Sequence, residues 1–185
     1  MPERLERGQQ GDVLRDVKHI ERMALASGEV EVSVVTYPFA VVITQDCELA
    51  QDWKYRRREP KHNDKLLDSV LVLPLFNVAH VFEGDYLNTL DLYAERVASD
   101  KRKRIKQNGE ARFHYLEFAK DSGLPELVAD FKRYFSVSMD EILAGKSERW
   151  VCTIGELYRE LLSQRFSAFL ARIALPDPDE PTATQ

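Results

Sequence analysis

One continuous apolar run constrains the fold of this chain more than any other segment. Residues 39–44 are apolar up to the closing Thr44, and β-branched side chains dominate them. This composition is typical of a strand that is covered on both faces or lies at the centre of a barrel. Pro38 precedes the run and cannot donate to a strand ladder, so we expect a break in the strand or a sheet edge there. The chain is therefore expected to fold around a β-sheet.

Strand patterns continue on both sides of this run. Residues 29–37 alternate, with Val30, Val32 and Val34 on one face and polar residues on the other, which predicts a half-buried strand. Further strands are predicted over residues 69–76, 113–118 and 127–137, and a short one after the turn at Gly11-Asp12. The segment 127–137 also allows a helical face, and we favour the strand.

Helical spacing appears in two later parts of the chain. Apolar residues recur three and four apart within residues 84–109, which predicts a helical insert between strands. Ser138 and Glu141 have the spacing of a capping box before a short helix, and Thr153 and Glu156 repeat that spacing before a longer one. The last helix carries a wide apolar stripe, so we expect an amphipathic helix that packs on the sheet.

Length and composition indicate one globular domain. The chain has 185 residues, of which 44% are hydrophobic and 31% are charged. We expect an α+β fold: a small β-barrel of about five to seven strands, with the helical insert at about 84–109 and a closing C-terminal helix. The domain is expected to span residues 1–176, and the Pro-, Asp- and Thr-rich residues 177–185 are expected to form a disordered tail.

Charge, cysteine content and missing motifs exclude several classes. The formal net charge is −5, so no global electrostatic attraction to nucleic acid is expected. Cys47 and Cys152 form no C-x-x-C pair, and nothing suggests secretion or a disulfide between them. No signal region and no apolar run of the ~20 residues that a membrane helix needs is present. The phosphate-loop, serine-hydrolase and zinc-protease motifs are missing. We expect a cytoplasmic protein without membrane association, cofactor or metal.

A polar elbow, Gln45-Asp46-Cys47-Glu48, follows the apolar strand, where a rigid scaffold can position functional groups. Asp46, Cys47 and His114 are the candidate catalytic residues, because a carboxylate can tune a thiol and histidine titrates near neutral pH. The structural alternative is that Asp46 caps a turn and Cys47 packs as a small apolar residue. An anionic neighbour also works against a reactive thiolate. The other histidines match no metal motif and are interpreted as surface or structural residues: His19, His62 and His80.

Two basic segments are candidates for contact with nucleic acid. The first is expected to be a loop and mixes aromatic residues with cations, which is what single-stranded nucleic acid needs. Its candidate residues are Trp53, Lys54, Arg56, Arg57 and Arg58. Those of the second segment are Lys101, Arg102 and Arg104. If both segments face one groove, phosphate binding follows despite the negative net charge. The alternative is a solvated loop and a solvated helix end.

The order of these elements resembles the MazF/PemK family of toxin endoribonucleases, which are SH3-like barrels. The resemblance implies an SH3-like barrel for this chain and covers about half of it. Gly11-Asp12 resembles the family's opening Gly-Asp turn, and residues 38–44 resemble its β-branched strand led by proline. Residues 70–75 resemble a further strand ending in proline, and residues 127–143 resemble a late strand with a short helix.

The residues at the family's catalytic positions differ in this chain. The family's catalytic arginine precedes the first proline, where Tyr37 stands here. Its catalytic threonine or serine follows the later proline, where Leu75 and Phe76 stand. RNA cleavage through the 2′-hydroxyl needs a base, an acid and charge stabilisation, and these side chains supply none of them.

We therefore expect a diverged barrel that binds nucleic acid or a protein, in a toxin–antitoxin or defence context. One alternative is an endoribonuclease with a relocated site near Asp46, Cys47 and His114. Another is a protein-interaction subunit that binds no nucleic acid. The expected partners are single-stranded RNA or DNA, a protein encoded nearby, or a second copy of this chain in a homodimer.

Overall fold

The computed structural model describes residues 6–26, 28–58, 64–119 and 122–172. Within these ranges, seven antiparallel strands form one sheet and six α-helices surround it, so the expected α+β class is confirmed. The strands are β1 (Asp12–Ala26), β2 (Glu29–Val42), β3 (Ser69–Asn77), β4 (Phe113–Leu116), β5 (Leu127–Asp130), β6 (Phe135–Ser138) and β7 (Trp150–Thr153). The helices are α2 (Asp46–Arg56), α3 (Val78–Glu83), α4 (Ser99–Lys106), α5 (Met139–Leu143), α6 (Lys146–Arg149) and α7 (Glu156–Leu170), with 3₁₀ turns η1 (Asn88–Leu90) and η3 (Phe131–Arg133).

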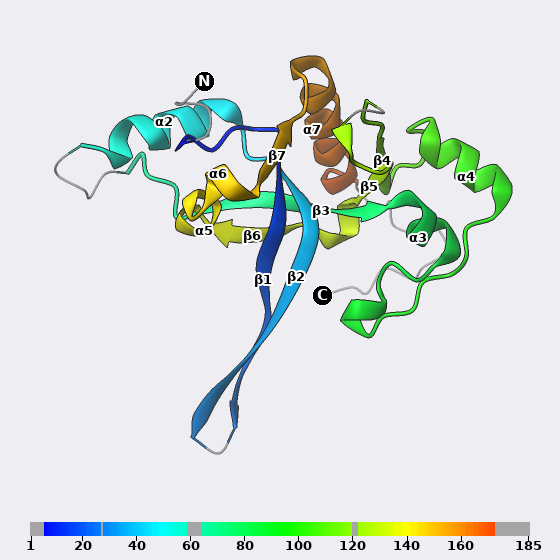
Figure 1. Ribbon diagram of the computed structural model, residues 1–185, viewed down its shortest axis with the longest axis horizontal. Coiled ribbons are helices and arrows are strands. Elements are labelled where there is room, and N and C mark those ends of the chain that lie inside the picture. The colour runs from blue at the N-terminus through cyan, green and yellow to red at the C-terminus, as the bar shows by residue number, and fades with distance from the viewer. Residues whose placement is uncertain (1–5, 27, 59–63, 120–121, 173–185) are drawn as a thin grey trace, which may run out of the picture.

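The sheet has the strand order β4-β5-β3-β2-β1-β7 (Figure 1). The strand β6 pairs with the first half of β3, on the same edge that meets β5 near the other end of β3. Nothing pairs β4 with β7, so the sheet of the described residues is not closed into a barrel. The expected strand over residues 127–137 is two short strands, because the turn η3 separates β5 from β6.

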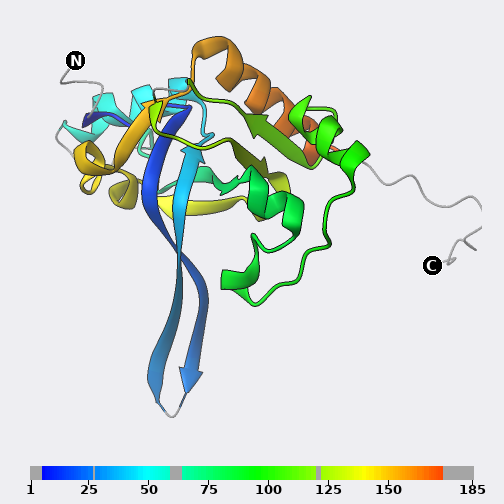
Figure 2. The same ribbon diagram turned by 45° about the vertical axis from the view of Figure 1, so that its right-hand side comes forward.

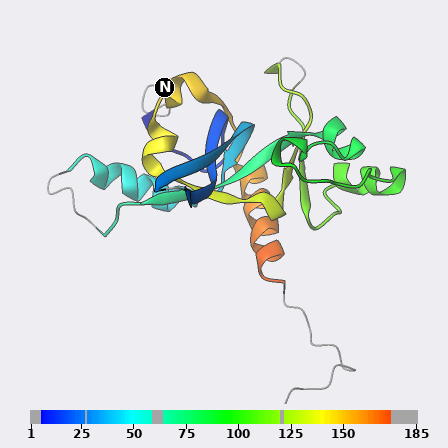
Figure 3. The same ribbon diagram turned by 90° about the horizontal axis from the view of Figure 1, so that it is seen from below.

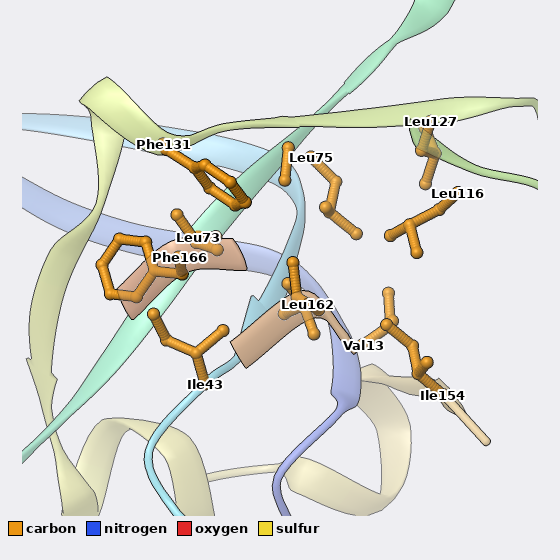
Figure 4. Close-up of a cluster of buried hydrophobic side chains, with 12 residues drawn as sticks. Val13, Ile43, Leu73, Leu75, Leu116, Leu127, Phe131, Ile154, Leu162 and Phe166 are labelled. Carbon is orange, nitrogen blue, oxygen red and sulfur yellow. The ribbon is translucent and has the colours of Figure 1, made fainter. Parts of the chain in front are cut away.

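Two apolar layers cover the two faces of the sheet. On one face, Leu162 and Phe166 of α7 pack with Val13, Leu73 and other core residues (Figure 4). On the other face, Leu49 of α2 and Met139 and Ile142 of α5 pack against β1, β2 and β3. The apolar run 39–44 supplies both layers, as its continuous hydrophobicity predicts: Val41 and Ile43 lie in the first, Ala40 and Val42 in the second.

The β1–β2 hairpin is longer than the sequence pattern predicts and projects from the body (Figures 1 and 2). The expected short strand after Gly11-Asp12 is the 15-residue β1. The strand over 29–37 is present, but the expectation that it is half-buried is wrong for Val30, Val32 and Val34, which are exposed. Pro38 does not end the strand, because β2 runs through it to Val42. Alternation in a sequence defines the two faces of a strand, but it does not show which face packs against another part of the protein.

Two other local expectations are wrong. The expected basic loop starting at Trp53 is the last part of α2 up to Arg56. The expected helix across 84–109 is confined to η1 and α4, because Asp91 adopts a left-handed conformation with φ 52° directly after η1 and residues 92–98 form no helix.

The two expected capping boxes have different outcomes. Ser138 caps α5 by accepting a hydrogen bond from the backbone N–H of Glu141, as predicted. Thr153 caps no helix: its hydroxyl donates to Asp12 at 2.7 Å, and α7 begins after Gly155. The buried stripe of α7 is also narrower than expected, because Leu157 is exposed. Cys47 and Cys152 are free thiols, as expected.

Candidate functional site

A cleft lies where the base of the β1–β2 hairpin meets the end of β3, the helix α3 and the turn η1. It has a volume of about 440 Å³. We call it the aromatic cleft, because four aromatic residues line it: Tyr37, Phe39, Phe76 and Tyr86. Its polar lining residues are Thr36, Asn77, His80, Asp85 and Thr89. An apolar cavity with a few convergent polar groups is the usual form of a ligand site.

Three rings form the wall of the cleft. The Phe76 ring stands edge-on to Tyr37, with ring centroids 6.1 Å apart, and edge-on to Tyr86, with centroids 4.9 Å apart. Edge-to-face contacts at these distances stabilise aromatic pairs and hold the rings in place. Tyr37 and Tyr86 are buried, whereas Phe76 is only half-buried. The wall therefore consists of two buried rings and one ring, Phe76, that is partly open to solvent.

The hydroxyl of Tyr86 is held by Asp130 and Arg112, which do not line the cleft. It donates to Asp130 at 3.0 Å, and Arg112 forms a 2.6 Å ion pair with the same carboxylate. Burial, with the Asp130 charge second, raises the pKa of Tyr86 far above its ordinary value. Burial also raises the pKa of Tyr37, against a smaller opposing effect of the Arg133 charge. Both phenols are therefore neutral at physiological pH, and Arg133 places a positive charge close to the wall.

A histidine–aspartate pair lies among the lining residues of the cleft. His80 Nδ1 is 2.9 Å from the Asp85 carboxylate, and both side chains are partly open to solvent. An ionised carboxylate only accepts hydrogen bonds, so Nδ1–H is the donor of this contact, and in the neutral imidazole Nε2 is then an acceptor. A carboxylate that orients an imidazole in this way prepares it to act as a general base.

The C-terminal end of α3 brings His80 and Asp85 together. Asn77 caps the start of the helix by accepting from the N–H of Ala79. Gly84 ends it with φ 84°, and a Cβ there would lie 2.5 Å from the carbonyl oxygen of Ala94. The left-handed turn brings Asp85 back to the last turn of α3, where its N–H donates to the carbonyl of His80 at 3.2 Å. Glycine at position 84 is thus what allows Asp85 to reach His80.

Of the three predicted catalytic residues, Asp46 and Cys47 are neighbours at the start of α2, and His114 lies apart from them. Asp46 accepts from Arg7 at 2.7 Å and from the N–H of Gln10, so it fastens the N-terminal segment to the start of α2. Cys47 is exposed, and its thiol donates to the side chain of Gln45, two residues earlier, at 3.7 Å. Asp46 therefore has a structural role, although it binds the N-terminal segment and does not cap its own turn. The expectation that Cys47 packs as a small apolar residue is wrong, because its side chain is exposed.

His114 lies elsewhere, in the wall of a second cavity of about 740 Å³ between β4 and β7, and neither Asp46 nor Cys47 lines that cavity. The side chain is 2% exposed. Burial, with the nearby Arg165 charge second, lowers the pKa of His114 to about 4. The imidazole is therefore neutral at pH 7 and belongs to the core beside Phe131.

In the first basic segment, Arg56 and Arg57 are paired with carboxylates, and other cations lie around the ring of Tyr55. Arg56 makes a bidentate contact with the buried carboxylate of Asp52, at 2.9 and 3.0 Å. Arg57 covers the Trp53 ring at 3.5 Å and pairs with Glu6. The remaining cations gather around Tyr55: Lys65, Arg58 and Lys54 lie 4.6, 5.3 and 5.7 Å from its ring centroid. His62 lies outside the described residues.

The second basic segment is on α4, and its arginines are bound within the molecule. Arg102 donates to the carbonyls of Val97 and Phe82, and Arg104 pairs with Glu110 at 2.9 Å. Lys101 is exposed. The helices α2 and α4 lie at opposite ends of the molecule in two perpendicular views (Figures 1 and 3). The two basic segments therefore do not share one groove.

The sequence contained a usable signal for the aromatic cleft. His80 was recognised only as a histidine without a partner, since Asp85 is five residues away in an expected helical insert. A histidine followed four residues later by glycine and then by aspartate is compatible with a helix that ends on the glycine and returns the carboxylate to the histidine. The aromatic wall had no such local signal, because Tyr37, Phe76 and Tyr86 come from three separate segments.

No family model and no curated protein matches the chain. In the described ranges, no three His, Cys, Asp or Glu side chains come together as a metal site requires. None of the helices described has both the length and the apolar character that crossing a membrane requires. The geometry of the aromatic cleft is therefore the basis for a functional proposal.

Proposed function

We propose that the protein is a binding module for single-stranded nucleic acid and holds an unstacked base in the aromatic cleft. The observation that carries the proposal is the wall of three edge-to-face rings with the His80–Asp85 pair among the lining residues. Bases of single strands stack on aromatic side chains and hydrogen-bond through their edges, and duplexes offer no unstacked base. The polar lining residues supply donors and acceptors for a base edge.

The resemblance to the MazF/PemK family gives independent support for this location. Tyr37-Pro38 and Leu75-Phe76 line the cleft, and these are the positions at which that family has its catalytic residues. On this proposal the curved sheet is an open variant of the family's SH3-like barrel, and the chain acts in a toxin–antitoxin or defence context. On the same proposal, the His80–Asp85 pair lies in the cleft where the family has its catalytic groups.

The proposal predicts preferential binding of single strands at the cleft. Fluorescence anisotropy with labelled single-stranded RNA, single-stranded DNA and duplex, at two salt concentrations, measures the preference. An oligonucleotide that carries 5-iodouridine, irradiated in the complex and mapped by mass spectrometry, locates the site. Cross-links to Phe76, Tyr37 or Tyr86 are expected. Cross-links to Tyr55 instead would move the binding surface to α2, and no binding at tens of micromolar in low salt would remove the function.

A second candidate function, RNA cleavage, is favoured by the orientation of His80. On this reading Nε2 of His80 removes the proton of a ribose 2′-hydroxyl, the 2′-oxygen attacks the adjacent phosphorus, and the 5′-oxygen leaves with a proton from solvent. The products are a 2′,3′-cyclic phosphate and a 5′-hydroxyl end. His80→Gln should then reduce cleavage at least ~100-fold, in line with the loss of a general base.

The control for this candidate is His19→Gln, which removes a histidine on β1 that does not line the cleft. It should leave cleavage unchanged. Equal rates for the wild-type protein and His80→Gln would exclude the pair as the base, and would leave the binding function untouched.

A further inference from the structure

The outer part of the β1–β2 hairpin leaves the body of the molecule (Figure 2). We call residues 18–26 and 29–36 the arm. The last pair of buried residues before it is Val17 and Tyr37, which lie opposite each other in the register. A two-stranded hairpin is marginally stable in water unless one face packs against something. The arm extends well beyond the sheet that could provide this packing.

One face of the arm is apolar beyond the pair Lys18–Thr36 at its base. The register places three cross-strand pairs on it: Ile20 with Val34, Met23 with Val32, and Leu25 with Val30. These six side chains are between 47% (Val32) and 77% (Leu25) exposed. Their exposed surface is on the order of 600 Å², at the upper end of the largest apolar patch of a typical monomer.

A β-bulge keeps this face continuous. The spacing from Ile20 to Met23 is three residues, which would turn Met23 to the opposite face of a regular strand. The register shifts between Ile20 and Arg22, so that Glu21 is the extra residue and Met23 returns to the side of Ile20. On β2 the three valines follow every second residue without interruption. The hairpin is therefore built to present one unbroken apolar strip.

The opposite face indicates what kind of partner fits. It carries Glu29 and Glu31 near the tip and the pair Arg22–Ser33 further in. These acidic residues on the opposite face near the tip disfavour contact of the arm with an anionic membrane surface or with nucleic acid. The strip itself contains no charge, so two such strips can meet without repulsion. A protein surface of the same apolar character is therefore the suitable partner.

We infer that this partner is a second copy of the chain, whose arm packs face to face on the first. The area is at the lower limit for this pairing, since each partner of a standard interface contributes about 600–1,000 Å². The side chains also differ in size between the strands: β1 supplies long ones (Ile20, Met23 and Leu25), and β2 supplies valines. A two-fold axis along the arm places each long row over the valine row of the other copy, which allows the layers to interdigitate. This inference is independent of the nucleic-acid site.

Sedimentation velocity of the full chain at up to about 100 μM tests the inference, because the affinity of such an interface is expected to be micromolar or tighter. A dimer is expected. Val32→Lys puts a charge into the centre of the strip and should give a monomer. Ser33→Lys puts the same charge on the next residue, on the polar face, and should leave the dimer intact. A monomeric wild-type protein, or a dimer that survives Val32→Lys, would overturn the inference.

Cross-linking provides a test that does not depend on the stability of Val32→Lys. In a chain in which Cys47 is serine and Cys152 is alanine, Met23→Cys places a thiol in the central pair of the strip, and Ala24→Cys places one on the opposite face. A short bis-maleimide should join two copies of Met23→Cys and leave Ala24→Cys uncoupled. Equal coupling of both variants, or of neither, would contradict face-to-face packing of the arms.

Discussion

Two histidines of this chain show how the environment decides the chemistry of a residue. His114 lies in the core beside Phe131 and Arg165, where burial favours the neutral imidazole. His80 lies at the protein surface, and Asp85 orients its ring so that Nε2 can meet a ligand. The sequence makes His114 a catalytic candidate only because histidine titrates near neutral pH, which holds equally for His80. The side chain of His80 has the geometry of a base, and His114 has that of a core residue.

The burial of His114 predicts a pH dependence of stability. An unfolded histidine takes up a proton near its ordinary pKa of 6.5, whereas folded His114 does so only near pH 4. Between these values the unfolded chain binds more protons, so the free energy of unfolding falls as the pH decreases. The contribution is up to about 3 kcal/mol. Urea titrations at several pH values should show that His114→Gln loses this part of the slope. Parallel pH profiles of the variant and the wild-type protein would be inconsistent with a depressed pKa.

The helix α2 shows how much of an element the sequence predicts. Its cations were recognised as a group, but the pattern gave no way to separate Arg56 from its neighbours. Asp52 is fully buried, accepts from Arg56 and also accepts from the N–H of Leu67 at 2.8 Å. This link joins α2 to the segment before β3. The contact between Asp52 and Leu67 joins residues 15 positions apart, so local helix propensity cannot predict it.

The different roles of the α2 cations predict different stabilities. Arg56→Ala removes the bidentate partner of a buried carboxylate and should lower the free energy of unfolding by about 2–3 kcal/mol, less than for a fully buried pair because Arg56 is partly exposed. Lys54→Ala, two residues earlier on an exposed side chain, should change it by less than about 0.5 kcal/mol. Chemical denaturation of both variants measures the difference. Similar values for the two would mean that Arg56 does not hold Asp52.

The hairpin strands show the opposite limit of prediction. The valine alternation predicted a strand correctly and its environment incorrectly, because periodicity is the same for a face that packs on a core and a face that packs on a partner. The bulge at Glu21 also hid the outer half of β1, since it interrupts the alternation that reveals a strand. Both errors arise at the arm, where the structure leaves apolar side chains exposed.

At the scale of the whole molecule, the sequence predicted the class of fold and most of the strands, but not which segments meet. The aromatic cleft joins the base of the hairpin, the end of β3 and the turn after α3, and Asp130 of β5 supports it from behind. These contacts come from the curvature of the sheet and from the path of the segment after Gly84. Whether both basic segments face one groove was open from the sequence for the same reason, and the fold places α2 and α4 at opposite ends of the molecule.

The most direct test of the central claim is a pair of tryptophan substitutions at neighbouring exposed positions of η1. Thr89 lines the aromatic cleft and Asn88 does not. Thr89→Trp should fill the cleft and weaken the binding of single-stranded RNA, measured by fluorescence anisotropy, by at least ~10-fold, because the loss of a stacked base costs about 1–3 kcal/mol. Asn88→Trp should bind as the wild-type protein does. Equal affinities for both variants and the wild-type protein would contradict the claim that a base occupies the aromatic cleft.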